Sequence, residues 1–262
     1  MVYFCFMTHL HRPLNLKKSL GQHFLKDELV CQSIVDALKQ NKFSQLLEIG
    51  PGAGALTKYL IDMKGVDFKA VEIDREKILF LKKKYPVLEN RIIELDFLQM
   101  EKPFDGSFTI IGNFPYNIST EILFKILTWR EDVETVIGMF QKEVALRIAA
   151  SEGNRVYGVT SVLLQAFFDV EYLFEVHEQA FHPPPKVKSA VIRLTPKREA
   201  IPMKSEKKFF LLVKTAFNQR RKTLRNAVKS LFTDDILNDV IFNKRAEQLT
   251  LLQFAELTWK MR

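Results

Sequence analysis

A glycine-rich turn between a buried strand and a helix constrains the fold of this chain more than any other feature. Residues 46–49 are apolar enough to predict a buried strand, which runs directly into Gly50-Pro51-Gly52-Ala53-Gly54, and a helix is expected through Leu60. Glycines let the backbone approach a ligand closely, and the first N–H groups of a helix are unpaired donors. The turn therefore indicates a nucleotide-binding unit, although a glycine pattern alone has many false positives.

A second predicted strand supports this interpretation. It covers residues 68–73 and brings two acids, Glu72 and Asp74, roughly 20 residues after the glycines. An acid at this spacing can accept hydrogen bonds from ribose hydroxyls. The glycines are spaced Gly-x-Gly-x-Gly rather than Gly-x-Gly-x-x-Gly, and nothing nearby is arranged for a pyrophosphate. The pattern therefore favours S-adenosylmethionine over NAD.

Two further predicted strands also end in polar residues. Residues 91–95 run into Asp96, which suits an adenine amine and could otherwise cap a helix. The apolar run 108–111 is predicted to be ended by Gly112 and Pro115 and to present Asn113. Open α/β sheets bind ligands at the carboxyl ends of their strands. Polar residues at successive strand ends therefore favour a binding site over a set of caps.

The segment Asn113-Phe114-Pro115-Tyr116 offers chemistry for a flat base. Asn113 supplies a side-chain carbonyl, and Pro115 pushes Phe114 toward an extended conformation that turns the Phe114 carbonyl outward. Two acceptors and the ring of Tyr116 suit an exocyclic amine. The alternative is a simple turn in which Asn113 caps and Pro115 starts the next helix. Taken alone, the segment does not decide between the two.

Strands and helices are predicted to alternate as far as Pro196, which indicates an α/β fold. Phe181 is followed by Pro183, Pro184 and Pro185, a stiff loop that cannot pair in a sheet and that would hold the ring at low entropy cost. The alternative for Phe181 is a ring packed in the core. Beyond Pro196 the strands cease, and shorter helices are expected to complete a small helical domain.

The net charge of +8 is confined to the last quarter of the chain. Residues 1–196 carry 24 Lys and Arg against 24 Asp and Glu, whereas residues 197–262 carry 15 against 7. Residues 206–232 are predicted to form one long helix with an apolar stripe and a basic stripe. The basic stripe and its flanks comprise Arg220, Arg221, Lys222, Arg225 and Lys229. Such a stripe suits the phosphates of a polyanion, and the alternative is a solvated helix face.

Other classes of protein are disfavoured. Cys5 and Cys31 give neither a disulfide framework nor a paired metal spacing, which fits a reducing cytoplasm. Cys5 lies near His9 and His11, but this grouping is a remote candidate for metal, so no metal is expected. Residues 1–7 lack the basic leader and cleavage site of a signal peptide, and no apolar run is long enough to span a bilayer.

Together, these motifs resemble the small-subunit (16S) ribosomal RNA adenine N6,N6-dimethyltransferase family. The resemblance extends over about residues 15–259. Its motifs are, in order, SLGQHFL (19–25), EIGPGAG (48–54), VEID (71–74), DF (96–97), NFPYNIST (113–120), FHPPPKVKS (181–189) and AFNQRRKTLRN (216–226). Seven motifs in the right order make this resemblance highly specific.

The resemblance implies a Rossmann-like class I methyltransferase fold, with a mostly parallel seven-stranded sheet covered by helices on both faces. It divides the chain into a flexible extension (1–14), a methyltransferase domain (15–196) and an all-helical basic RNA-binding domain (197–262). The implied reaction transfers methyl groups from S-adenosylmethionine to the 6-amino groups of two adjacent adenosines in a hairpin near the 3′ end of small-subunit ribosomal RNA. The expected enzyme is a cytoplasmic monomer that acts on an immature small subunit.

The resemblance also implies roles for individual residues. Expected cofactor contacts are His23, Leu25, Gly50, Gly52, Glu72, Asp96 and Asn113. The target amine is expected at Asn113 and at Phe114, whose conformation Pro115 sets, and its base between Tyr116 and Phe181. His23 stands where many family members carry Asn, and Phe114 stands where many carry Leu, which leaves the exact contact of His23 open.

Several alternatives share part of this pattern. Large-subunit RNA methyltransferases of the macrolide-resistance type share the glycine turn and the Asn-x-Pro-Tyr motif, but residues 217–226 and the triple proline match the small-subunit enzymes better. A catalytically idle assembly factor on the same fold is disfavoured by the intact Asn113, Pro115 and Tyr116. A DNA adenine methyltransferase would need a sequence-reading domain, and a dehydrogenase would need a proton-relay residue at the sheet edge.

Overall fold

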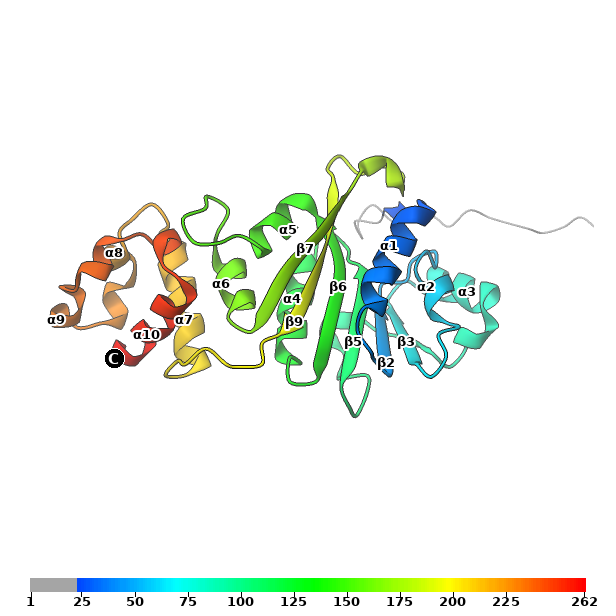
Figure 1. The fold of residues 1–262 in the computed structure, drawn as a ribbon, viewed down its shortest axis with the longest axis horizontal. Helices are drawn as coiled ribbons and strands as arrows, with labels where there is room; N and C mark the ends of the chain where they lie inside the picture. The colour runs from blue at the N-terminus through cyan, green and yellow to red at the C-terminus, as the bar shows by residue number, and fades with distance from the viewer. Residues whose placement is uncertain (1–22) are drawn as a thin grey trace, which may run out of the picture.

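The fold was taken from a computed structural model, which describes residues 23–262 (Figure 1). Its seven-stranded sheet has the order β4-β3-β2-β5-β6-β9-β7, and β9 alone runs opposite to the other six strands. This confirms the predicted mostly parallel sheet. The strands are β2 (Gln45–Ile49), β3 (Asp67–Glu72), β4 (Ile92–Glu94), β5 (Phe108–Asn113), β6 (Val133–Gln141), β7 (Phe168–Val176) and β9 (Ser189–Pro196). The expectations for residues 1–14 and for Cys5, His9 and His11 lie outside the described residues.

A separate two-stranded sheet joins β1 (Phe24–Leu25) to β8 (Phe181–His182). The helices of the α/β part are α1 (Glu28–Lys39), α2 (Thr57–Leu60), α3 (Arg75–Lys84), α4 (Ser119–Thr128), α5 (Lys142–Ile148) and α6 (Val159–Gln165). Those of the C-terminal part are α7 (Glu206–Asn218), α8 (Leu224–Val228), α9 (Asp234–Leu237) and α10 (Leu251–Lys260). The short 3-10 turns are η2 (Pro86–Leu88), η3 (Phe97–Gln99), η4 (Glu178–Ala180), η5 (Lys229–Leu231), η6 (Val240–Asn243) and η7 (Ala246–Gln248).

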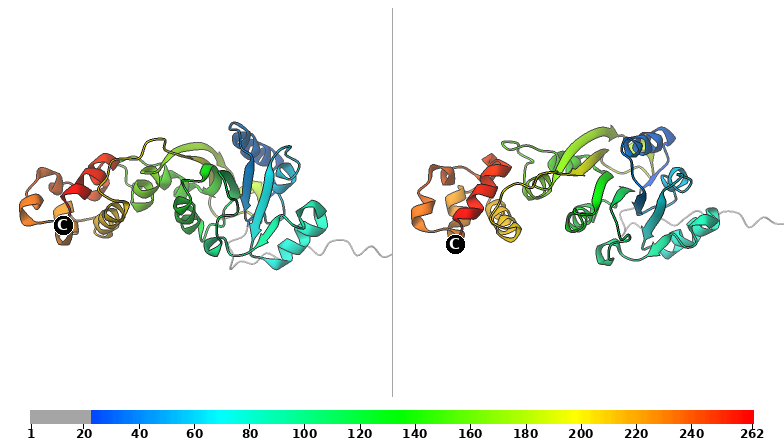
Figure 2. Two further views of the ribbon diagram at one scale, coloured as in Figure 1. Left: turned by 90° about the horizontal axis from the view of Figure 1, so that it is seen from below. Right: turned by 60° about the horizontal axis from the view of Figure 1, so that its bottom comes forward.

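Helices cover both faces of the large sheet, as predicted (Figure 2). Ile110 and Val136 pack with side chains of α4, α5 and α6, whereas the next residues, Ile111 and Ile137, pack with α1, α2 and α3. Successive side chains of a strand point to opposite faces. A strand buried on both faces therefore needs apolar residues at every position, which explains the continuous apolar runs in the sequence.

Strand β5 continues through Gly112 and Asn113, so the prediction that Gly112 ends this strand is wrong. Gly112 pairs with Gly138 of β6, and the ring of Phe114 fills the space beside them. A Cβ atom at Gly112 would lie 2.6 Å from both Ile49 O and Phe114 Cε1, and one at Gly138 would lie 2.9 Å from Phe114 Cε2. The glycines therefore make room for an aromatic side chain inside a continuous strand.

The predicted single helix over residues 206–232 is also wrong. Helix α7 ends at Asn218, and α8 begins only at Leu224, whose N–H donates to Lys244 O. The break lets α8 fold against α7, so that Leu224 enters the same apolar cluster as Val213. A periodic apolar stripe in the sequence cannot indicate that the chain folds back on itself here, because this break depends on tertiary packing.

The C-terminal part, residues 197–262, contains helices and no strands, as predicted. Helix α7 packs on α6, and the ring of Phe217 lies 6.1 Å from that of Tyr157. Within residues 23–262, none of the helices combines the length and apolar character that a bilayer crossing demands. The same residues contain no group of three or more His, Cys, Asp or Glu side chains placed to hold a metal ion.

The carboxyl group of Glu48 lies inside the α/β core. Glu48 of β2 is 2% exposed, and its Oε2 accepts a hydrogen bond of 2.7 Å from Thr57 Oγ1. The pKa of Glu48 is raised to about 8, mainly by burial and to a smaller extent by the nearby charge of Glu72, against the lowering effect of the Thr57 hydrogen bond. The glycine turn thus connects a strand that carries a buried acid to a helix that supplies its hydrogen-bond donor.

Replacing Gly112 by Ala tests the space required by Phe114. Overpacking of this kind costs roughly 1–3 kcal/mol, and we expect the free energy of unfolding to fall by about that amount. The measurement is chemical denaturation followed by circular dichroism. In the matched control Gly106→Ala the new Cβ lies 3.4 Å from the side chain of Gln45, so we expect a change within about 0.5 kcal/mol. Equal stabilities of Gly112→Ala and the unmodified protein would contradict the packing account.

Replacing Glu48 by Gln tests its buried charge. The folded-state pKa of about 8 exceeds the ordinary value of 4.5, so the folded protein holds a proton that the unfolded chain releases. Glu48 therefore stabilises the fold less as pH rises from about 4.5 to about 8. As pH rises from 5 to 8, the stability of Glu48→Gln should increase relative to that of the unmodified protein. The expected increase in the difference between their free energies of unfolding is at least about 1.4 kcal/mol. Exposed Glu121→Gln is the control, and parallel pH curves for Glu48→Gln and the unmodified protein would refute this account.

Candidate active site

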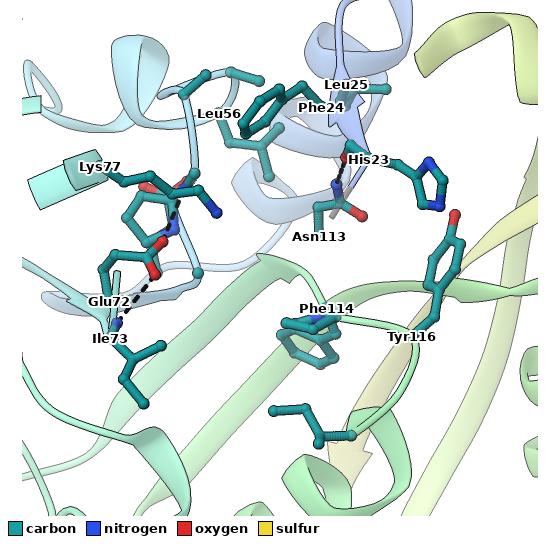
Figure 3. A pocket seen from close by; sticks show the side chains of 18 of the residues that line it. His23, Phe24, Leu25, Leu56, Glu72, Ile73, Lys77, Asn113, Phe114 and Tyr116 are labelled. Carbon is teal, nitrogen blue, oxygen red and sulfur yellow. Dashed lines mark hydrogen bonds between the residues drawn. The ribbon is translucent and has the colours of Figure 1, made fainter. Parts of the chain in front are cut away.

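An open cavity of about 900 Å³ lies at the carboxyl ends of β2, β3 and β5 (Figure 3). This volume includes space that is open to the solvent. The residues predicted from the sequence that line it are His23, Leu25, Gly50, Gly52, Glu72, Asn113, Phe114, Pro115 and Tyr116. These residues come from four separate stretches of the chain, so the cavity is a product of the fold.

Asp96 and Phe181 are not among the residues that line the cavity. Asp96 follows β4 and caps η3, with its Oδ1 accepting a hydrogen bond of 2.9 Å from the N–H of Leu98. Phe181 is 1% exposed and belongs to the core cluster beside α1, while its backbone pairs with Leu25. The structure therefore places Asp96 at a cap and packs the ring of Phe181 in the core.

The glycine turn and Glu72 form one wall of the cavity. Gly50 and Gly52 have φ angles of +66° and +57°, which side chains rarely adopt. The N–H of Gly52 donates to Glu72 Oε2 at 3.3 Å, while Glu72 Oε1 accepts from the N–H groups of Ile73 and Asp74 at 3.0 and 2.9 Å. Backbone donors thus fix a carboxylate at the mouth of the turn, where it can accept hydrogen bonds from hydroxyl groups.

Asn113 and Phe114 contribute two different acceptors to the opposite wall. Asn113 Nδ2 donates to His23 O at 3.2 Å, and this hydrogen bond leaves the side-chain Oδ1 as the free acceptor atom (Figure 3). The side chain of Phe114 is fully buried, with its ring edge-on to that of Phe140 at 5.0 Å. Because the ring points into the core, Phe114 can contribute a hydrogen-bond acceptor to the cavity only through its backbone.

Tyr116 presents its ring at the open side of this wall. Its hydroxyl bonds to Ser189 Oγ at 2.5 Å, and burial raises the pKa of this phenol, which keeps it neutral. The centroid of the Tyr116 ring is 5.6 Å from that of His23, whose Nδ1 donates to Pro183 O at 2.9 Å. Both rings are therefore held by hydrogen bonds at their polar atoms.

The cavity also contains residues that the sequence interpretation did not assign to it. Phe24 packs its ring 3.5 Å from the position of a Cβ on Gly52, and Lys77 of α3 places its Nζ 5.4 Å from the centroid of that ring. Glu48 reaches the floor of the cavity. Phe24 could have been found from its place next to His23 in the sequence. Lys77 could have been found from its place one helical turn after Asp74, at the same sheet edge.

The predicted basic residues of the C-terminal part differ in exposure. Arg221, Lys222 and Lys229 are exposed. Arg220 is half-buried and lies 4.0 Å from Glu247 Oε2, and Arg225 is half-buried with its Nε shielded from solvent. They occupy the turn after α7, helix α8 and the start of η5, so they do not form one helical stripe.

Comparison with known proteins places this architecture in a defined family. A family model described as ribosomal RNA adenine dimethylase matches residues 14–258. The ribosomal RNA small subunit methyltransferase A of Cytophaga hutchinsonii is 54% identical over 246 residues, which cover 92% of this chain and 95% of that protein. The protein of the same name from Flavobacterium johnsoniae is 51% identical over 249 residues, which cover 94% of this chain and 95% of the relative.

Solved structures share the same architecture. The crystal structure of a dimethyladenosine transferase from Plasmodium falciparum matches with a TM-score of 0.76 and 26% identity, covering 90% of this chain and 96% of that one. The 23S rRNA methyltransferase ErmE matches with a TM-score of 0.65 and 24% identity, covering 90% and 99%, and this likeness shows the fold alone. The family model and the relatives both span nearly the whole chain, and this protein therefore belongs to the ribosomal RNA adenine dimethylase family.

Proposed function

We propose that this protein transfers methyl groups from S-adenosylmethionine to the 6-amino groups of two adjacent adenosines in a hairpin near the 3′ end of small-subunit ribosomal RNA. The observation that carries the proposal is the pairing of Asn113 Nδ2 with His23 O, which leaves Asn113 Oδ1 as an acceptor beside Phe114. Relatives that are at least half identical to this chain are named for the small subunit, which favours that RNA over the large-subunit alternative.

The cavity fits the proposed cofactor. Glu72 is held by three backbone N–H groups with its carboxylate toward the cavity, and we assign it to the ribose hydroxyls. Apolar side chains of Phe24, Leu25 and Ile73 line the same space and suit the flat base. S-adenosylmethionine supplies a methyl group that its sulfonium charge already activates. The protein therefore needs to orient the two reactants and to stabilise the charge that develops between them.

Asn113 and Phe114 carry the chemistry in this proposal. The lone pair of an adenine amine is delocalised into its ring, which makes the amine a poor nucleophile. Hydrogen bonds to Asn113 Oδ1 and to the Phe114 carbonyl favour a pyramidal nitrogen and stabilise the positive charge that forms as it attacks. No strong base is needed for this step. After one methylation a single N–H remains, so one of the two acceptors then loses its partner.

The base itself needs a surface on which to stack. Tyr116 offers a ring whose hydroxyl is tied to Ser189, so that little entropy is lost when a base lies against it. We retain Phe181 as the proposed second face, although its side chain is 1% exposed and would have to turn outward. We also retain Asp96, which follows β4 at the same sheet edge, as the proposed partner of the cofactor's adenine amine.

We assign catalysis to residues 15–196 and RNA binding to the basic residues 197–262, since the excess positive charge is confined to the latter. A hairpin bound by the C-terminal helices could then reach the cavity of the α/β part. We further propose that the protein works as a cytoplasmic monomer on an immature small subunit. Sedimentation of the protein with assembling subunits tests this last assignment.

Replacing Asn113 by Ala tests the acceptor assignment. We expect methyl transfer to small-subunit RNA to fall by about 100-fold or more, because a donor or acceptor aimed at developing charge typically contributes that much. Binding of S-adenosylhomocysteine, measured by calorimetry, should change by only a few fold. Asn90→Ala, an exposed residue before β4, is the matched control. Unchanged turnover of Asn113→Ala would remove Asn113 from the mechanism.

Replacing Arg221, Lys222 and Lys229 together by Ala tests the RNA-binding assignment. Each lost phosphate contact should lower the slope of log affinity against log salt by about 0.7–0.9. The matched control replaces Lys42, Lys64 and Lys102, which are exposed and precede β2, β3 and β5 at the opposite, amino edge of the sheet. Equal salt slopes for the two triple variants would show that Arg221, Lys222 and Lys229 are solvated and do not bind RNA.

A further inference from the structure

Two lysines and one glutamate form an ion-pair cluster at the carboxyl edge of the sheet. Lys142 is the first residue of α5, Lys188 immediately precedes β9, and Glu175 lies near the end of β7. Lys142 Nζ pairs with Glu175 Oε2, and Lys188 Nζ donates to Glu175 Oε1 at 2.5 Å. We call these residues the Lys142–Glu175–Lys188 cluster.

The cluster lies next to the residues that hold Tyr116. Ser189, which bonds to the Tyr116 hydroxyl, follows Lys188 directly and pairs in the sheet with Gln141, the residue before Lys142. The N–H of Lys142 also donates to Lys188 O at 2.9 Å. Both lysines are therefore one residue away from the paired strand ends that fix the proposed stacking ring. In Figure 1, α5 and the upper ends of β7 and β9 come together in this region.

Hydrogen bonding within the cluster favours the charged forms of Glu175 and Lys142. Hydrogen bonds from Lys142 and Lys188 lower the pKa of Glu175 to about 2, and the hydrogen bond to Glu175 raises the pKa of Lys142. The cluster thus carries one net positive charge. An ammonium group has three N–H donors, and the contact with Glu175 occupies one on each lysine. The side chains of Lys142 and Lys188 are 38% and 39% exposed, so the remaining donors have access to a ligand.

Stabilisation of the fold is a weak explanation for this arrangement. Ion pairs with this degree of exposure contribute about 0–1 kcal/mol, and two long side chains lose rotamer freedom when they are held on one carboxylate. Holding two cations close together is unfavourable unless an anion lies between or beside them. Glu175 supplies one anion, and the remaining positive charge of the two lysines favours the binding of a second.

We propose that Lys142 and Lys188 bind a backbone phosphate of the RNA strand that delivers its base to Tyr116, and that Glu175 positions both ammonium groups before the RNA arrives. This inference rests on the proposed function and extends it to a second RNA contact, within the α/β part. A base that leaves its stack to enter an enzyme cavity brings its own phosphates to the cavity mouth. Two cations fixed in advance next to the Ser189–Tyr116 contact would bind a phosphate at a lower entropy cost than two free lysines.

The test replaces both lysines by Gln and compares RNA binding and methyl transfer with the unmodified protein. We expect KM for small-subunit RNA to rise about tenfold and the salt slope of RNA affinity to fall by about 0.7–0.9 for the lost phosphate contact. Affinity for S-adenosylhomocysteine should not change, because neither lysine lines the cavity. The single variants Lys142→Met and Lys188→Met keep the aliphatic stems and should each show part of the effect.

The matched control is Lys102→Ala. Lys102 pairs with Asp132 at 2.6 Å, and the two side chains are 43% and 31% exposed, close to the values of 38% and 31% for Lys142 and Glu175. Asp132 precedes β6 and Lys142 follows it, so the control pair lies about 30 Å away at the amino edge of the sheet. Removing Lys102 should leave KM and the salt slope unchanged.

Glu175→Gln separates phosphate binding from a structural role, because the two predict different salt slopes. If the lysines bind phosphate, removing the carboxylate keeps both cations but loses their positioning, so RNA affinity falls by a few fold while its salt slope holds, whereas the lysine variants lower that slope. If the cluster only stabilises the strand ends, Glu175→Gln and the lysine variants lower the melting temperature alike and leave the salt slope unchanged, which overturns the proposal. Failure of the unmodified protein to methylate small-subunit RNA would instead refute the proposed function.

Discussion

The burial of the Phe114 ring is the constraint on which the rest of the site depends. The ring fits only because Gly112 and Gly138 face each other on neighbouring strands and leave space that any side chain would fill. Once the ring is buried, the positions of the residues on either side of it are largely fixed. Asn113 ends the strand facing His23, and Pro115 turns the chain toward α4. A packing requirement deep in the sheet thus determines where two hydrogen-bond acceptors stand at its edge.

The cofactor side of the cavity is determined by backbone donors. Glu72 accepts hydrogen bonds from its own two successors and from Gly52, which connects the end of β3 to the turn after β2. Neighbouring parallel strands thereby share one carboxylate at their carboxyl ends. Because the donors are main-chain groups, their positions follow from the sheet and the glycine turn, and the side chains of the turn have little influence on them. The buried Glu48 lies below the same turn and contributes the second acid of the cavity.

Local patterns were enough to predict most of this architecture. Continuous apolar runs revealed the strands, and glycine spacing with acids at strand ends located the cavity that includes Gly50, Glu72 and Asn113. The errors concern contacts between distant residues. The break after Asn218 depends on α8 packing back against α7, and the place of Gly112 inside β5 depends on its pairing with Gly138 of β6. Neither pairing leaves a periodic signal, so only the assembled fold reveals them.

The contacts of His23 have a consequence for the order in which the protein can assemble. This residue bonds to Pro183, 160 positions later in the chain, and to Asn113, 90 positions later. Contacts of such high sequence separation form late, because a long loop must close, at a cost in entropy, before the contact contributes any favourable free energy. During synthesis from the amino end, the first strand has to wait until residues 181–182 have left the ribosome before it finds its partner. The cavity is therefore among the last parts of the α/β fold to close, because the wall that contains His23 and Leu25 is completed only by a segment made more than 150 residues later.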